Sequence, residues 1–114
     1  MRNGDNAGDL TIENKVQVVI RGKDLMSAEE ADSPCRRIYF IIQLMYVDEI
    51  NLQEYHNIYW SLVRDVLKAA PSTHAIIDEI STDILCGRYY RALKTARRLI
   101  KHEQQLLRGV LSNQ

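Results

Sequence analysis

Hydrophobic residues follow two different periodicities along the chain. Leu10 and Ile12 alternate with polar residues, and residues 16–20 form a β-branched run, so residues 9–21 are predicted to form a two-stranded hairpin. From residue 34 onward, apolar residues recur every three or four positions, which is typical of amphipathic helices. The pattern predicts a mainly α fold, with a small N-terminal β-hairpin followed by a bundle of about four helices.

Residues 34–47 are predicted to form the central core helix. Ser33 is suited to the N-cap and Pro34 to the first helical position, where its missing N–H costs little. Between Ile38 and Val47 the only plainly polar side chain is Gln43. A helix that is apolar on nearly all sides must be buried on several of them.

Three further helices are expected, over residues 52–69, 74–86 and 88 to about 107. Asn51 and Glu54 have the spacing of a capping box, as do Ser27 and Glu30 in the acidic segment before the core helix. Gly87 occupies the usual position after a helix end. The third helix is expected to bury Ile76, Ile77, Ile80, Ile84 and Leu85. The last is expected to bury Tyr89, Ala92, Leu93, Ala96, Leu99, Ile100, Leu107 and Val110.

The length of 114 residues predicts one domain, 1–114, with a β-rich part at 1–23 and a helical part at 34–111. Asn3-Gly4 is a strong hairpin-turn pair, and we expect the strand before this turn to be missing. The resulting unpaired strand edge favours a homo-oligomer.

Global charge points to no particular partner, because 15 basic and 15 acidic residues cancel. The first nine residues do not resemble a signal peptide, and no apolar run approaches the roughly 20 residues of a membrane span, so a cytoplasmic chain without membrane contact is expected. Cys35 and Cys86 are too few for a disulfide framework and lack metal-site spacing.

The distribution of charge is more informative than its sum. Residues 48–83 hold seven acidic residues against Arg64 and Lys68, whereas one face of the last helix is basic. Such a face suits phosphates, but it could also pair with the acidic helices or simply face water. Two more cations, Arg36 and Arg37, occupy the first turn of the core helix, where the helix dipole disfavours them. Acidic neighbours or an anionic partner should hold them there.

No catalytic arrangement is visible. The three histidines are scattered, and the sequence has neither a nucleophile elbow nor a phosphate-binding glycine loop. We therefore expect no enzyme activity, no cofactor and no metal.

The core helix also carries a family resemblance. The strings that carry it are Ala31-Asp32-Ser33-Pro34, Arg36-Arg37-Ile38-Tyr39-Phe40, Gln43-Leu44-Met45-Tyr46 and Gly87-Arg88-Tyr89-Tyr90-Arg91-Ala92-Leu93-Lys94. Together they resemble the flagellum biosynthesis repressor family, FlbT. The resemblance implies a cytoplasmic post-transcriptional regulator that binds the 5′ untranslated leader of flagellin mRNA and represses translation or promotes mRNA decay, although some relatives could activate instead.

The residues from this motif and the basic helix face give a set of candidate RNA contacts. They are Arg36, Arg37, Arg88, Arg91, Lys94, Arg97, Arg98 and Lys101. In the turn at the N-terminus, Asn6-Ala7 stand where the family often carries basic residues, which weakens an RNA contact from that turn.

A second interpretation is a protein-binding adaptor or chaperone of the flagellar assembly and export system, with other flagellar proteins as partners and no direct RNA contact. Two observations discriminate between them: whether Trp60 is exposed, and whether Arg36 and Arg37 share a surface with the basic face of the last helix.

Overall fold

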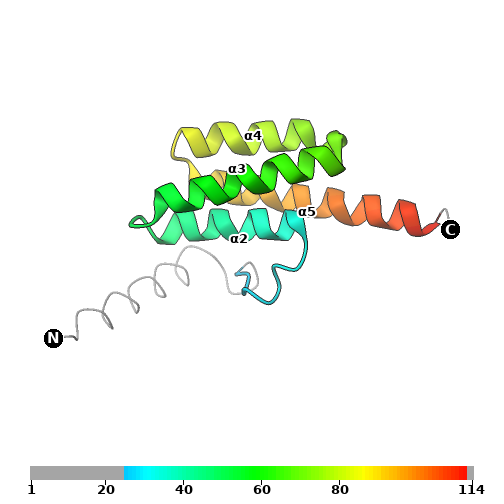
Figure 1. Cartoon of the computed structure of the whole chain (residues 1–114), viewed down its shortest axis with the longest axis horizontal. Helices are drawn as coiled ribbons and strands as arrows, with labels where there is room; N and C mark the ends of the chain where they lie inside the picture. Colours follow the sequence, from blue (N-terminus) through cyan, green and yellow to red (C-terminus); the bar gives the residue numbers. More distant parts are fainter. Residues whose placement is uncertain (1–24, 113–114) are drawn as a thin grey trace.

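The computed structural model describes residues 25–112, with side chains up to Gly109. Within these residues the chain forms four α-helices and one short 3-10 helix (Figure 1). They are α2 (Pro34–Val47), α3 (Leu52–Ala69), η2 (Pro71–Thr73), α4 (His74–Leu85) and α5 (Tyr89–Ser112). The predicted helical bundle is confirmed, whereas the predicted hairpin at residues 9–21 lies outside the described residues.

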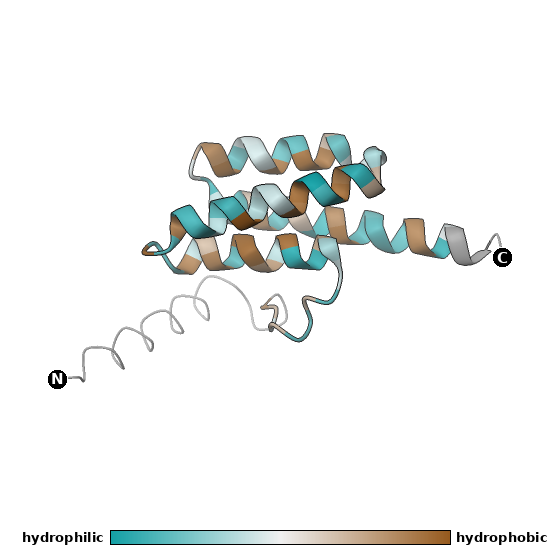
Figure 2. Cartoon of the chain, in the orientation of Figure 1, coloured by the Kyte–Doolittle hydropathy of each residue, from teal (hydrophilic) through white to brown (hydrophobic). Residues whose placement is uncertain are grey.

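The helices form a bundle in which α2 and α5 share the central position. Helix α2 packs against α3 and α5, while α5 packs against α2 and α4. The α2 and α5 helices run in opposite directions, and α5 continues past the ends of the other helices (Figure 1). Hydrophilic and hydrophobic residues recur in turn along α3, α4 and α5, as the amphipathic sequences of these helices predict (Figure 2). No helix within residues 25–112 is long and apolar enough to cross a membrane.

The N-terminus of α2 is capped by its own Ser33 and by a residue of α5. Ser33 Oγ accepts a hydrogen bond of 3.2 Å from the backbone N–H of Arg36, as the sequence predicts. The Glu103 carboxylate accepts one from Ser33 Oγ at 2.6 Å and one from the backbone N–H of Cys35 at 3.3 Å. A carboxylate at this position also complements the positive end of the helix dipole. Glu103 therefore ties the start of α2 to α5.

Cys35 lies directly beneath this cap and is buried, with 3% of its surface exposed. Burial, together with the neighbouring Glu103 carboxylate, raises the pKa of the Cys35 thiol to about 12. The thiol therefore stays protonated and unreactive at neutral pH.

The prediction of a capping box at the start of α3 is wrong, because the Asn51 side chain does not make the hydrogen bond that such a box requires. Asn51 does occupy the N-cap position, but its side chain makes no cap bond and donates instead to Asp48 Oδ2 at 2.9 Å. Asp48 also accepts from the Ile50 N–H and the Tyr55 hydroxyl, and these bonds lower the pKa of its carboxyl group. Asn51 does not cap α3 because its side chain is held by Asp48 in a local turn, and this turn competes with the cap.

The other two predicted end signals are confirmed. Ser27 and Glu30 make the reciprocal backbone-to-side-chain bonds of a capping box, at 2.9 and 3.3 Å. Gly87 follows α4 with a φ of +75°, a left-handed conformation that favours glycine.

Two residues predicted to lie in the core are exposed. Leu85 exposes 71% of its surface, because the core face of α4 follows Ile77, Ile80 and Ile84, about a quarter turn away. Leu107 exposes 58%, because it lies where α5 continues past the bundle (Figure 1).

We expect Glu103→Ala to lower the free energy of unfolding by about 1–3 kcal/mol, because it leaves the Cys35 N–H and the Ser33 hydroxyl without their partner. Urea denaturation followed by circular dichroism measures this effect, with Gln104→Ala, the exposed neighbour on the same helix, as the control. Equal stability of the two variants would contradict the role assigned to Glu103.

Candidate nucleic-acid interface

The basic face of α5 divides into two sides, and one of them faces the acidic residues of α4. Arg98 Nη1 lies 3.1 Å from Glu79 Oε1. Asp83, which is 4% exposed, accepts from Arg88 Nε at 3.0 Å and lies 3.9 Å from Arg91 Nε. One of the two alternatives to phosphate binding was pairing with the acidic helices. Three of the residues predicted to contact RNA do face acidic residues of α4 in this way.

The other side of α5 faces α2 and forms what we call the α2-facing stripe. Its members recur at steps of four and three residues, which places them on one line along the helix. They are Tyr90, Lys94, Arg97, Lys101 and Gln104. All five are exposed.

At its N-terminal end the stripe begins with aromatic contacts. The Tyr90 ring lies 5.8 Å from the ring of Tyr46 on α2, and Lys94 Nζ lies 5.1 Å from the Tyr90 ring centre. A cation over a tyrosine face gives a modest attraction at an exposed site. Tyr90 nevertheless keeps 38% of its surface exposed.

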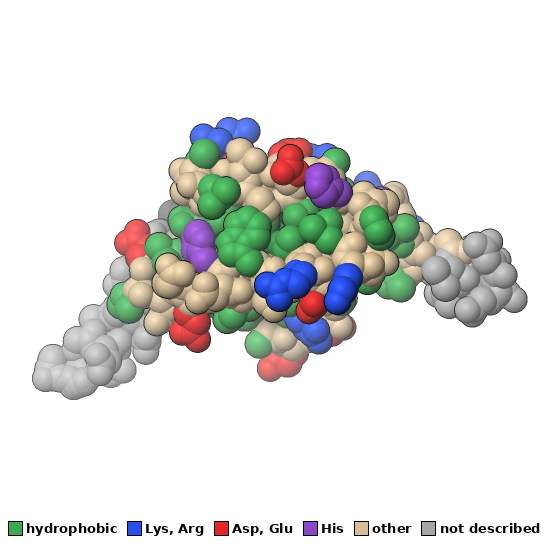
Figure 3. All heavy atoms as spheres, turned by 45° about the horizontal axis from the view of Figure 1, so that its top comes forward, with side chains coloured by type: hydrophobic (Ala, Val, Ile, Leu, Met, Phe, Trp, Pro, Cys, Tyr) green, Lys and Arg blue, Asp and Glu red, His purple; other side chains and the backbone are tan. Residues whose placement is uncertain are grey.

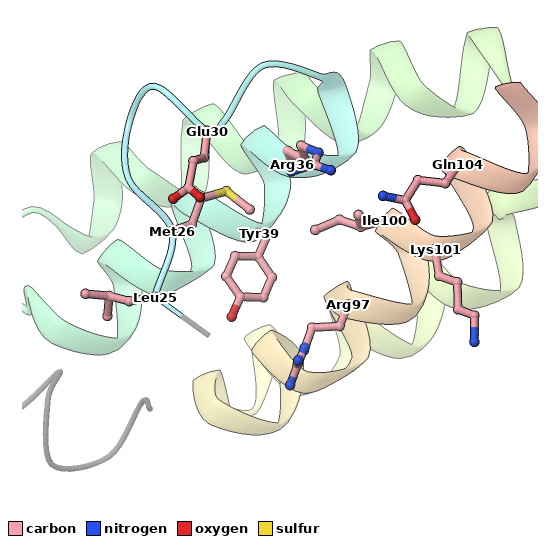
Figure 4. Close-up of a pocket in the computed structure, with 9 residues that line it drawn as sticks. All are labelled: Leu25, Met26, Glu30, Arg36, Tyr39, Arg97, Ile100, Lys101 and Gln104. Carbon is pink, nitrogen blue, oxygen red and sulfur yellow. The ribbon is translucent and has the colours of Figure 1, made fainter. Parts of the chain in front are cut away.

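Further along, the stripe borders a pocket of about 470 Å³ between α2, α5 and residues 25–30, here called the α2–α5 pocket (Figure 4). Its lining residues are Leu25, Met26, Glu30, Arg36, Tyr39, Arg97, Ile100, Lys101 and Gln104. Arg36 of the core helix thus lines the same pocket as Arg97 and Lys101 of the α2-facing stripe. Arg37 is exposed but does not line this pocket.

Local contacts hold the charges at the pocket. Arg36 Nε lies 3.7 Å from Asp32 Oδ1, so an acidic neighbour offsets part of the unfavourable dipole interaction of Arg36, as one of the sequence alternatives required. Hydrogen bonds from Ser27 lower the pKa of the Glu30 carboxyl group, and Arg36 adds to the effect. Glu30 is therefore ionised at neutral pH.

A second pocket of about 400 Å³ lies at the other end of the contact between α2 and α5. Its lining includes Met45 and Tyr46 from α2 and Tyr90 and Arg91 from α5. The surface that joins the two pockets along the α2-facing stripe is called the α2–α5 seam below. It combines cations, exposed aromatic surface and two concave ends.

Gln43 supports this surface in a way that the sequence analysis missed. Its side-chain amide accepts from the Met26 N–H at 3.0 Å and donates to the Met26 carbonyl at 2.9 Å. Gln43 itself is only 6% exposed. A single amide in an otherwise apolar helix indicates a buried hydrogen-bond partner, although the sequence does not say which one.

The aromatic residues of α3 belong mainly to the core. Tyr59 is fully buried and its hydroxyl lies 2.7 Å from Ser81 Oγ on α4, while burial raises the pKa of Tyr59 to about 12. Trp60 is half-buried and stands edge-on to Tyr59 at 4.9 Å. Within residues 25–112 no group of three or more histidine, cysteine or acidic residues is placed to hold a metal ion.

Comparison with known proteins identifies the family. The family model described as flagellar protein FlbT matches residues 1–107. The chain belongs to the FlbT family.

Curated FlbT relatives align over most of the chain. It is 39% identical over 104 residues to the probable flagellum biosynthesis repressor protein FlbT 1 of Bradyrhizobium diazoefficiens, covering 91% of this chain and 70% of the relative. The corresponding protein of Caulobacter sp. is 34% identical, covering 94% and 82%. The flagellum biosynthesis repressor protein FlbT of Caulobacter vibrioides is 31% identical, covering 98% and 80%. No solved structure matches the chain.

The strings that resembled FlbT in the sequence now have structural roles. Ser33 caps α2 and donates a hydrogen bond to Glu103. Arg36 and Tyr39 line the α2–α5 pocket, and Gln43 holds Met26. The FlbT-like motif of the core helix therefore builds one wall of the pocket and fixes the segment opposite it.

Replacing Gln43 by leucine should detach residues 25–31 from α2, because both backbone groups of Met26 lose their side-chain partner. We expect faster hydrogen exchange of the Met26 amide and a loss of about 1–3 kcal/mol in the free energy of unfolding. Gln53→Leu on the exposed surface of α3 is the matched control. Unchanged exchange at Met26 in the Gln43 variant would show that the bond does not hold the segment.

Proposed function

We propose that this chain represses flagellum biosynthesis after transcription, by binding the 5′ untranslated leader of flagellin mRNA along the α2–α5 seam. The observation that carries the proposal is the meeting of Arg36 with Arg97 and Lys101 around one pocket. The names of the curated relatives support the repressor role. The RNA target follows from the chemistry of the seam and from what the FlbT resemblance implies.

The stripe suits a nucleic-acid backbone. Lys94 and Lys101 are seven residues apart, which corresponds to about 10 Å along a helix. Cations fixed at such intervals on a rigid helix can neutralise successive phosphates and release counterions. The exposed ring of Tyr90 offers a surface on which an unpaired base can stack. Backbone contacts and stacking together are the usual means by which proteins bind single-stranded RNA.

The candidate contacts differ in how much of their charge remains available. Arg88, Arg91 and Arg98 already face the carboxylates of Asp83 and Glu79. Lys94 and Lys101 form no ion pair with any residue in the range 25–112. We therefore assign the main phosphate contacts to Lys94 and Lys101, with Arg36 and Arg97 beside Lys101 at the α2–α5 pocket, and only a supporting electrostatic role to the α4-facing arginines.

Repression follows from where the RNA is held. A protein bound to the untranslated leader would compete with the ribosome or alter the access of nucleases to the message. Both routes need only tight and selective binding by the seam, and no catalytic group.

The adaptor interpretation finds some support on another face. Hydrophobic side chains gather over the side of the molecule that carries α3 and α4 (Figure 3), and α3 supplies the half-buried Trp60. That surface could receive a protein partner while the seam binds RNA. We favour RNA binding as the primary activity because the basic seam includes a residue of the FlbT motif, whereas Trp60 lies outside the motif strings.

Alanine substitution separates the two sides of α5. We expect Lys94→Ala and Lys101→Ala each to weaken binding of the flagellin leader several-fold and to reduce the slope of log affinity against log salt by about one. Arg98→Ala should change the affinity less than either lysine substitution, because Arg98 faces Glu79 on the α4 side of α5, away from the stripe. Fluorescence anisotropy at several salt concentrations measures both quantities.

Two results would contradict the assignment. If the well-folded chain does not distinguish the flagellin leader from an unrelated RNA, the proposed function is wrong and a protein partner becomes the better explanation. If all three variants lose the same affinity, the α2-facing stripe has no special role.

A further inference from the structure

We propose that the α2–α5 pocket holds one unpaired nucleobase of the RNA bound along the seam. This inference rests on the proposed function and adds to it the place where sequence is read. Phosphate contacts position an RNA but carry no sequence information, so a selective regulator needs a site for the base itself.

The walls of the pocket suit a flat, largely apolar ring. Met26 from the preceding segment and Ile100 from α5 lie on opposite sides of the pocket, and the ring of Tyr39 lies between them (Figure 4). Ile100 and Met26 are half-buried, so both keep a surface that a ligand could cover. The pocket volume of about 470 Å³ is within the usual range of roughly 300–1,000 Å³ for small-molecule sites.

The charges around the pocket favour a nucleotide over a bare anion. Arg36, Arg97 and Lys101 supply three positive groups. In Figure 4, Arg97 and Lys101 extend from α5 at one side of the pocket. The ionised carboxylate of Glu30 also lines the pocket and would repel a small anion placed inside. A nucleotide satisfies both features, because its phosphate can meet the cations while N–H groups on the base edge donate to Glu30.

The pocket wall is held in place before any ligand arrives. Gln43 bonds both backbone groups of Met26, and Ser27 and Glu30 close the next turn on each other. Because the wall is already ordered, less conformational entropy is lost when a ligand binds. This arrangement distinguishes the pocket from a flexible surface that only follows the phosphate backbone.

Gln104→Trp tests the inference by filling the pocket from an exposed position, without removing a cation. The control is Gln105→Trp, which adds the same side chain one residue further along the same exposed helix, outside the pocket lining. Circular dichroism and thermal unfolding confirm that both variants fold. The probes are the flagellin leader RNA, an unrelated RNA of equal length, and leader RNAs with a single abasic nucleotide at each unpaired position.

We expect Gln104→Trp to weaken leader binding at least tenfold and binding of the unrelated RNA less than twofold, whereas Gln105→Trp changes neither by more than twofold. One abasic leader should bind the wild-type chain at least tenfold more weakly than the intact leader. In the Gln104→Trp variant the same abasic change should have almost no further effect, because the pocket is already closed.

The results of this experiment distinguish a failure of the base-pocket proposal from a failure of the proposed function. If the wild-type chain binds the leader selectively but Gln104→Trp binds it as tightly as Gln105→Trp does, the pocket holds no base, while RNA binding along the seam stands. If abasic substitutions weaken both chains equally, the base is read elsewhere. If the wild-type chain shows no selectivity for the leader, the proposed function fails and the inference fails with it.

Discussion

The contact between Glu103 and the start of α2 sets the geometry on which the seam depends. One carboxylate from α5 accepts from the Ser33 hydroxyl and the Cys35 N–H, so it satisfies polar groups that the end of a helix leaves without partners. It also adds a directional polar contact between two antiparallel helices that otherwise meet mainly through apolar side chains. On the same two helices, Arg36 lies at the same pocket as Lys101.

The second constraint is the division of charge around α5. The chain has no net charge, and the acidic residues of α4 form ion pairs with basic residues on only one side of α5. The buried carboxylate of Asp83 needs cations nearby, since a buried charge without a partner is unfavourable, and Arg88 and Arg91 supply them. On the side toward α2, Lys94 and Lys101 form no ion pair with a residue in the part of the chain that the structure describes. A neutral chain can therefore present a basic surface, because pairing with the acidic residues of α4 is confined to the other side of α5.

Local signals predicted the elements well and the contacts between them less well. Ser33-Pro34 and Gly87 mark the ends of α2 and α4 correctly, because capping depends on residues next to each other in the chain. The partner of Ser33 lies 70 residues away, so no local pattern points to Glu103. Likewise, the sequence gives a basic helix face, but which arginines meet α4 depends on how the helix is rotated in the bundle. Asn51 failed as a cap because Asp48 offered its side chain a competing bond.

The most direct test of RNA binding along the α2–α5 seam is to map the bound RNA on the chain. Backbone amide chemical shifts of the ¹⁵N-labelled chain, recorded during titration with the flagellin leader, report which residues change environment. If the RNA binds along the seam, the largest changes follow the α2-facing stripe and residues 25–36, with small changes on α3 and α4. Changes centred on the Trp60 side of α3, or no difference between the leader and an unrelated RNA, would contradict it.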